Sequence, residues 1–281
     1  MKFHSFLMTM MASFGFVAIA AAQSIVLTIN KNASLIQNLT RTDAVDATGA
    51  TVHTASFDIQ LNNLPATKAV VLALQTLATS KTSLQPKVAA SISTVPLELE
   101  FQMLDFNNNN LEDKVYSSVS IEEVKISALN ASEKNTVVLS YKIKAKKVAA
   151  LPTGQKIAPP SLKAAKALSS NYAITIGNLP TKRVSKISEM IIRPTSNALV
   201  PFTIELVAID GADWSQWLNT GAAGLRKEQG TIDLLTPNLR TTILSLKLSD
   251  VQIQSYSVNN ATGGAISKST VGLAAAAITI L

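Results

Sequence analysis

The sequence contains no cysteine and only two histidines, His4 and His53. Without cysteine, the chain has no disulfide bond, no thiolate nucleophile and no cysteine–zinc site. Charged residues make up 15% of the 281 residues, against about 25% in an average protein. No phosphate-binding loop and no dinucleotide-binding fingerprint occurs. These absences count against most enzyme classes, and we expect no catalytic residue, no cofactor and no resident metal.

Apolar residues are abundant, at 47% of the chain, and the formal net charge is +7. This composition supports a folded core and argues against disorder. The length suits one large domain or two of ordinary size. The basic residues are not accompanied by a set of stacking aromatic side chains, so the sequence predicts no specific nucleic-acid partner.

The N-terminus has the layout of a secretory signal peptide, which we expect to be residues 1–22. Lys2 forms a minimal basic region, the stretch from Phe6 to Ala22 is almost continuously apolar, and small residues precede Gln23. The mature chain would begin near Gln23 and be exported, to the periplasm or the extracellular space. An uncleaved membrane anchor is the alternative, although the run is near the lower length limit for a span.

Three sequence blocks recur in the same order and predict an internal duplication. The first alternates apolar and polar residues and ends in Asn-Leu-Pro in both copies, which is typical of a half-buried strand that enters a turn. The second matches without a gap, and the third is followed in both copies by an Asn-Ala pair and a closing strand. The three pairs are Phe57–Pro65 with Tyr172–Pro180, Val95–Asp105 with Val200–Asp210, and Ser120–Ile126 with Leu248–Ile253.

The predicted fold class is mainly β, with two tandem small β-barrel or β-sandwich domains that each contain at most one short helix. Residues 24–150 would form the first domain, the Pro- and Ala-rich residues 151–170 a linker, and residues 171–281 the second domain. Thr, Val, Ile and Ser dominate the expected strands, as pleated sheets favour. The expected strands are 24–30, 55–62, 96–104, 121–128, 136–146, 172–177, 201–209, 230–235, 241–257 and 268–280, and the expected helices are 66–78 and 213–218.

An ordered set of features in residues 172–281 resembles the tail-tube protein family of contractile phages. The family includes the tube proteins of type VI secretion and of extracellular contractile injection systems. The shared features are a short Gly-Leu strand end, here with Asn178 between the two residues, a helix with Trp-Leu-Asn and a Thr-Ile-x-Leu strand. Val251-Gln-Ile253 replaces the family's Ala-Trp-Pro, and residues 55–146 give only a fainter echo without tryptophan. The matching residues are Gly177, Leu179, Trp217, Leu218, Asn219, Thr231, Ile232 and Leu234.

The resemblance implies a small β-barrel or sandwich with one flanking helix. It also implies a protein whose copies close into sixfold rings that stack into a tube. A chain with two such domains would build the same ring from three subunits, and other tube or baseplate-like components would be its partners. The resemblance implies no enzymatic activity.

One loop resembles part of a calcium-binding loop. Oxygen-bearing side chains fall at its first, third, fifth and ninth positions, namely Asp105, Asn107, Asn109 and Asp113. Tyr116 stands where the bidentate glutamate belongs, so the alternative is an ordinary polar turn, which Asn and Asp favour.

Two pairs of residues are candidates for an interface. Trp214 and Trp217 are three residues apart and share one face of the expected helix; we expect them in the core or at a subunit interface, and binding of sugar or another partner is the alternative. Lys142 and Lys144 alternate on one strand, where they would meet nucleic acid, lipid headgroups or an acidic partner, or protect an edge strand. We favour the edge strand.

The sequence thus predicts an exported structural protein that works by self-association into rings or tubes. The alternative is an exported β-sandwich binding module or adhesin that recognises a glycan, calcium or a surface partner.

Overall fold

The computed structural model describes residues 24–79, 98–160, 163–194, 196, 198–220, 226–260 and 266–281. The predicted signal peptide lies outside these residues. Within them, no helix combines the length and hydropathy that a membrane span requires.

The first half of the chain contains β1 to β9 and one helix. Its elements are β1 (Ser24–Ile29), β2 (Asn32–Val45), β3 (Thr51–Gln60), α1 (Pro65–Thr79), β4 (Leu99–Leu104), β5 (Asn110–Ser117), β6 (Ser120–Ile126), β7 (Leu129–Asn130), β8 (Val138–Ala145) and β9 (Lys147–Ala150).

The second half contains β10 to β17 and one α-helix. Its elements are β10 (Tyr172–Ile176), β11 (Val184–Ile187), β12 (Met190–Ile192), β13 (Val200–Val207), the 3-10 helix η1 (Ala208–Asp210), α2 (Gly211–Thr220), β14 (Glu228–Leu235), β15 (Thr242–Asn259), β16 (Lys268–Ala275) and β17 (Ala277–Ile280).

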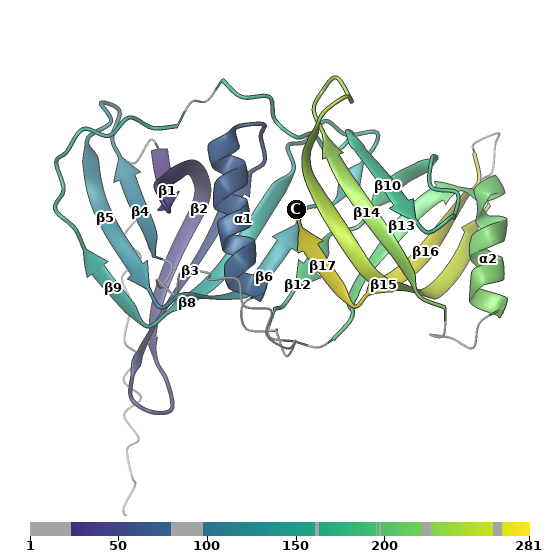
Figure 1. The fold of residues 1–281 in the computed structure, drawn as a ribbon, viewed down its shortest axis with the longest axis horizontal. Helices are drawn as coiled ribbons and strands as arrows, with labels where there is room; N and C mark the ends of the chain where they lie inside the picture. Colours follow the sequence, from purple (N-terminus) through teal and green to yellow (C-terminus); the bar gives the residue numbers. More distant parts are fainter. Residues whose placement is uncertain are drawn as a thin grey trace, which may run out of the picture.

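The strands form two sheets that lie side by side (Figure 1). The first has nine strands in the order β12-β6-β8-β3-β2-β1-β4-β5-β9. The second has the order β10-β14-β15-β16-β13-β11-β7, with β17 also paired to β15. The second sheet nearly closes into a barrel, because the chain before β10 lies against β7: the Asn130 N–H donates to the Ser169 carbonyl. The mainly β fold class with one short α-helix in each half is confirmed.

Alternation of apolar residues builds the two cores. In β3, Ala55, Phe57 and Ile59 are buried while their neighbours are not, as a strand with one face on a core requires. In the first half the rings of Phe57 and Phe101 meet edge to face at 5.3 Å, and Phe57 stacks on Tyr141 at 5.5 Å. Aromatic pairs in these geometries add to the area that they bury.

Six strand pairings of the first half have counterparts in the second half, whereas the β1–β2 pairing has none. In the first half, β1 pairs with β4, β4 with β5, β5 with β9, β2 with β3, β3 with β8, and β6 with β8. In the second half the counterparts are β10 with β14, β14 with β15, β15 with β17, β11 with β13, β13 with β16, and β15 with β16. The long β15 takes the place of both β5 and β6. It carries a positive φ of 50° at Asp250, and Ser118, between β5 and β6, has a φ of 55°.

Matching irregularities occur in the counterpart strands. The β6–β8 pair has a register shift between Ile121 and Glu123, and the β15–β16 pair has one between Ile253 and Ser255. In the first half α1 follows β3, which pairs with β8. In the second half α2 follows β13, which pairs with β16. The two halves therefore agree in topology and in the position of a β-bulge.

These pairings correct the sequence correspondence. The third block pair lies in counterpart strands, β6 and β15, but its residues are out of register, because Ile121 and not Ile126 is the counterpart of Ile253. The first two pairs are wrong: β3, which contains Phe57 and Asp58, corresponds to β13 and not to β10, and β4 corresponds to β14 and not to β13. Half-buried strands share the same alternation of apolar residues, so the pattern alone cannot assign one strand to another.

The halves exchange strands. β12 of the second half pairs with β6 at the edge of the first sheet, and β7 of the first half pairs with β11 at the edge of the second. Met190 in β12 and Leu129 in β7 are both 0% exposed. Arg193, which follows β12, forms an ion pair with Glu123 of β6 at 2.8 Å, and α1 contacts β17 across the boundary.

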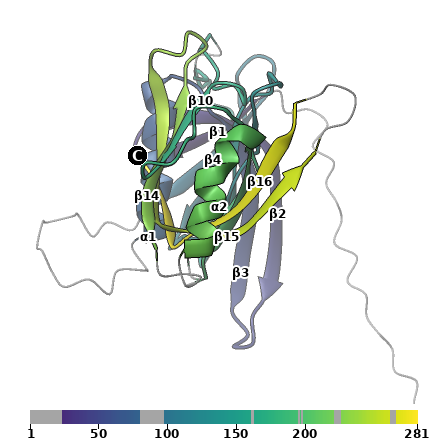
Figure 2. The same ribbon diagram turned by 90° about the vertical axis from the view of Figure 1, so that its right-hand side faces the viewer.

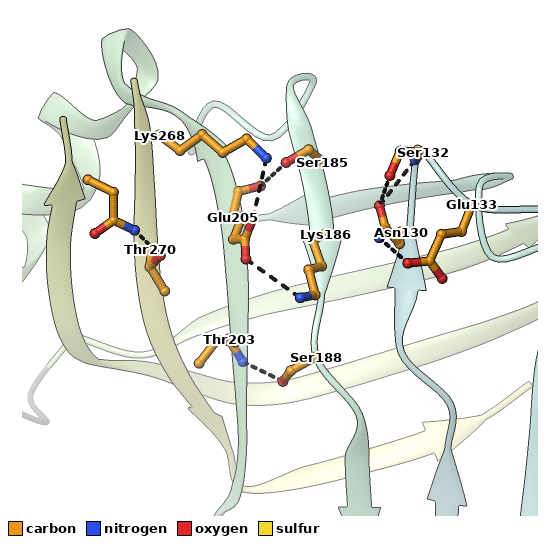
Figure 3. A network of polar contacts seen from close by, with 11 residues as sticks. Asn130, Ser132, Glu133, Ser185, Lys186, Ser188, Thr203, Glu205, Lys268 and Thr270 are labelled. Atoms are coloured by element: carbon orange, nitrogen blue, oxygen red, sulfur yellow. Dashed lines mark hydrogen bonds and ion pairs between the residues drawn. The ribbon is translucent and has the colours of Figure 1, made fainter. Parts of the chain in front are cut away.

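A polar row on the outer face of the second sheet crosses the same boundary (Figure 3). Glu205 of β13 lies 3.8 Å from Lys186 of β11 and 3.5 Å from Lys268 of β16. Asn130, in the exchanged strand β7, caps its own turn through Ser132 and Glu133. This face is solvated, so the pairing of β7 rests on backbone bonds and on Leu129, which points inward.

The β2–β3 hairpin projects from the body of the first half (Figures 1 and 2). β1 pairs with β2 only as far as Ile36, whereas β3 pairs with it to Val45. The outer part of the hairpin is thus a two-stranded ribbon, and Val45 near its tip is 71% exposed.

We expect Met190→Ala to lower the free energy of unfolding by about 2–5 kcal/mol, because the substitution leaves a cavity where β12 packs on the first half. Urea unfolding followed by circular dichroism measures the change. Glu189→Ala, at the exposed neighbouring position, should change it by less than about 0.5 kcal/mol. Equal effects of the two substitutions would contradict a structural role of the exchanged strand.

Candidate assembly surfaces and polar sites

The tryptophan pair lies on α2, which covers the second half. Asp213 in its first turn suits the positive end of the helix dipole. Trp214 is 0% and Trp217 2% exposed, with ring centroids 6.1 Å apart. The Trp214 indole N–H donates to the Pro180 carbonyl at 3.3 Å. Arg226 lies over the Trp217 ring at 5.5 Å. Both rings are part of the core of the chain, and neither offers an open face to a sugar.

The lysine pair lies on the solvent side of β8. The predicted edge position is wrong, because β8 lies between β6 and β3 and is hydrogen-bonded on both sides. Lys142 contacts Glu122 at 3.2 Å, and Lys144 pairs with the other oxygen of the same carboxylate. Both lysine side chains remain about half exposed. Their backbone is not available to a partner strand, but their ammonium groups are.

The β-bulge in β6 places two neighbouring acids on one face. Side chains alternate between the two faces along a regular strand, which would put Glu122 and Glu123 on opposite faces. The register shift between Ile121 and Glu123 brings them to the same face. Glu122 binds the two lysines of β8, and Glu123 binds Arg193. Burial raises the pKa of Glu122, but the hydrogen bonds from Lys144 and Lys142 outweigh it and hold the pKa below its ordinary value.

The predicted calcium loop is the turn between β4 and β5. Asp105 Oδ1 accepts the backbone N–H of Asn107 at 2.7 Å and of Asn109 at 2.8 Å, and Oδ2 accepts the Asn109 side-chain amide at 2.8 Å. These bonds hold the pKa of Asp105 below its ordinary value. Asp113 lies in β5 opposite Gln102, three residues before Asp105 on β4, which is about 10 Å along the strand. The structure therefore brings Asp105, Asn107 and Asn109 together but not Asp113.

Asp113 belongs to a separate polar cluster on the outer face of β4 and β5. Its Oδ2 accepts the side-chain amides of Gln102 and Asn110, each at 2.9 Å. Gln102 also donates to Glu100 at 2.7 Å. Burial, followed by the charge of Asp113, raises the pKa of Glu100. Sequence reasoning missed this cluster, since β5 was taken for a polar loop.

A second cluster missed by sequence reasoning lies inside the first half. Arg41 of β2 pairs with Glu112 of β5 at 2.7 Å and lies 5.9 Å from the centre of the Phe101 ring. Lys114 pairs with the other oxygen of Glu112 at 2.6 Å. Burial raises the pKa of Glu112, but hydrogen bonds from Lys114 and Arg41 outweigh it and lower the pKa below its ordinary value. The cluster ties the β2–β3 hairpin to β5.

Acidic residues and histidines do not converge on a metal site within the described part of the chain, where no group of three such side chains could share an ion. His53 lies opposite Asp43 in the β2–β3 hairpin, with 2.7 Å between Nδ1 and Oδ1. Among the described residues, no nucleophilic side chain forms a hydrogen bond with this pair.

Among the described residues, several strand edges have no neighbouring strand on one side. The first sheet ends in β9 and the second in β10. β15 pairs with β14 only up to Val251, so Gln252–Asn259 has a neighbour on the β16 side alone. The outer part of β2 likewise has a neighbour only on the β3 side. Such edges are templates for pairing with another chain.

We expect Trp214→Ala to lower the free energy of unfolding by about 3–5 kcal/mol, since a fully buried ring is replaced by a cavity. Asn219→Ala, on the exposed side of the same helix, is the matched control and should have little effect. Chemical unfolding followed by far-UV circular dichroism measures both. A small effect of Trp214→Ala would show that the helix does not depend on this ring.

We expect Glu112→Gln to lower stability above pH 4.5 and to lose its effect in acid. The pKa of Glu112 lies below its ordinary value of 4.5 in the folded chain, so its stabilising contribution is present above 4.5 and disappears as the pH falls through the folded value. Urea midpoints of the two proteins measured between pH 7 and pH 3 should converge. Glu189→Gln, at an exposed position, should run parallel to the wild type, and a constant gap for Glu112→Gln would contradict the ion pair.

No known family model matches the chain, and no curated protein matches it in sequence. Three solved structures resemble part of it. The sheath–tube complex of an extracellular contractile injection system (PVC) in its extended state is 14% identical with a TM-score of 0.33, over 40% of this chain and 88% of that chain. The tube-terminating cap of the anti-feeding prophage is 16% identical with a TM-score of 0.33, over 40% and 87%. The PVC sheath/tube terminator is 14% identical with a TM-score of 0.30, over 44% and 98%.

Proposed function

We propose that this chain is a structural, non-enzymatic protein that self-assembles into rings or tubes. Each copy would contribute two tail-tube-like units, so that three copies close a ring with pseudo-sixfold symmetry. Other tube or baseplate-like components would be its partners. The matching pairings of the two halves support an origin by duplication of one such unit.

The strand exchange within the chain carries the proposal. β12 on β6 and β7 on β11 join two sheets of the same topology by backbone pairing. A unit that attaches to its neighbour by strand addition within a chain has the chemistry to do so between chains. Strand addition leaves no free edges once a ring closes, which is one way that β-proteins avoid uncontrolled aggregation.

Export remains part of the proposal and rests on the sequence of residues 1–22. A secreted chain without cysteine has no disulfides to stabilise it. Its stability would come from the two cores and from assembly.

An exported binding module is the second candidate. A cleft of about 620 Å³ between the halves favours it. The start of α1 lines the cleft with Asn62 and Lys68, and the β14–β15 turn lines it with Thr236 and Asn238. These polar groups suit a small hydroxylated or anionic ligand. The buried tryptophans do not contribute to it.

The mass of residues 23–281 in solution separates the two candidates. Light scattering at several concentrations, with negative-stain images of the same samples, should give trimers or larger rings and stacked rings with a central hole. A strict monomer at high concentration would contradict self-assembly and leave the binding module as the better account.

A further inference from the structure

We propose that the second half of one copy binds the first half of the next copy through the contact that already joins the two halves within the chain. The free edge of β15 at Tyr256–Val258 would pair with the outer edge of β2 at Thr42–Ala44 in another copy. The inference rests on the proposed self-assembly and names its contact surfaces. Three steps lead to it.

The first step is the residue correspondence between β6 and β15. Ile121 and Ile253 are the residues before the register shift in the two strands, and they face Ile143 of β8 and Leu273 of β16. Counting on from there, Val124 and Ile126 of β6 correspond to Tyr256 and Val258 of β15. Val124 thus corresponds to Tyr256, Lys125 to Ser257, and Ile126 to Val258.

The second step is the partner that occupies this edge in the first half. β12 pairs with β6 through Met190 with Ile126, Ile191 with Lys125, and Ile192 with Val124. The counterpart edge of β15 lies beyond the last β14 pair, Glu228 with Val251. Figure 2 looks onto this outer side of the second half, with α2 in front and β15 and β16 beside it. No strand among the described residues covers the edge.

The third step is the counterpart of β12 in the first half. Lys186 of β11 faces Glu205, and Gln37 of β2 faces Asp58. Asp58 and Glu205 are equivalent, because Ala55 and Phe202 face the equivalent residues of β8 and β16. Lys186 therefore corresponds to Gln37. The register of β2 then shifts by one residue, because Gln37 faces Asp58 and Thr40 faces Ser56. Ser188, whose N–H donates to the Thr203 carbonyl, therefore corresponds to Thr40. Met190–Ile192 then corresponds to Thr42–Ala44 in the projecting hairpin.

Apolar side chains are buried where the halves contact each other within the chain, and they are exposed at the equivalent surfaces that have no partner. Met190 and Leu129, which take part in the exchange within the chain, are 0% exposed. The counterpart regions leave large apolar side chains in solvent: Val45 in the hairpin is 71% and Val258 in β15 is 46% exposed. A second copy would cover them.

The contact uses different surfaces of the two partners, so it is heterologous. Repetition of a heterologous contact gives a closed ring if the rotation closes and a helical filament if it does not. The hairpin also gains from binding, since an isolated two-stranded ribbon is only marginally stable in water. The same interaction thus orders the hairpin and covers the β15 edge.

Two single-cysteine variants test the contact directly, because the chain has no cysteine of its own. Thr42 and Val258 are counterparts of the paired residues Met190 and Ile126, and both are exposed. Residues directly opposite in an antiparallel pair are close enough for a disulfide. Thr42→Cys and Val258→Cys chains, made with tags of different size, are mixed at equal amounts and oxidised. We expect the mixed dimer to exceed both homodimers several-fold.

The control replaces the hairpin cysteine with Lys142→Cys, which is exposed on a strand already paired on both sides. A mixture of this variant with Val258→Cys should give mixed dimers only at the statistical ratio. A statistical ratio for Thr42→Cys with Val258→Cys, in a protein that light scattering shows to assemble, overturns the contact and leaves self-assembly standing. A monomer that does not crosslink overturns both.

Charge variants test the same pair without crosslinking. Thr42→Asp combined with Val258→Asp places like charges opposite each other, which should weaken association by about threefold per contact. Thr42→Lys combined with Val258→Asp should restore it. Equal association of the two double variants would contradict the proposed register.

Discussion

The backbone N–H and C=O groups at a sheet edge need partners, and this requirement determines how the two halves of the chain are joined. An unpaired edge invites uncontrolled pairing with other chains. Here the first sheet is extended by β12 and the second by β7, each taken from the other half. Because each exchanged strand also buries an apolar side chain, the halves become one continuous structure. The linker residues 151–170 are bound to the first half, through bridges to Asn62, Asn109 and Thr136.

The shared topology of the halves explains why the edge of β15 and the outer edge of β2 remain open. The connection between β11 and β13 supplies the strand for the neighbouring half, whereas its counterpart between β2 and β3 forms a hairpin that projects into solvent. The edge of β6 is covered, whereas the counterpart edge of β15 is bare. The edge of β6 is occupied by β12 of the same chain, and the equivalent edge of β15 is free to bind another copy. A subunit of a head-to-tail assembly requires such a free surface.

The mainly β fold and the two helices could be predicted from local pattern, because alternation at Ala55, Phe57 and Ile59 and the Ala- and Leu-rich run of α1 are local signals. β5 could not, since Asn107–Asp113 has the composition of a turn and its strand character depends on β4. β12 is too short to leave a periodic signal. The shared face of Trp214 and Trp217 was predictable, but their burial depends on strands far away in the sequence. The bulge that brings Glu122 and Glu123 to one face has no sequence signature.

Charge separates the contact within the chain from its proposed copy between chains. Glu123 of β6 binds Arg193 beside β12. Their counterparts are Ser255 in β15 and Val45 in the hairpin, which carry no charge. The contact between copies therefore has the backbone pairing and the apolar cover but not the ion pair, and its two partners are not held at the high effective concentration that one chain provides. Association between copies should be the weaker and more concentration-dependent of the two, so the halves would stay joined while the assembly forms and comes apart.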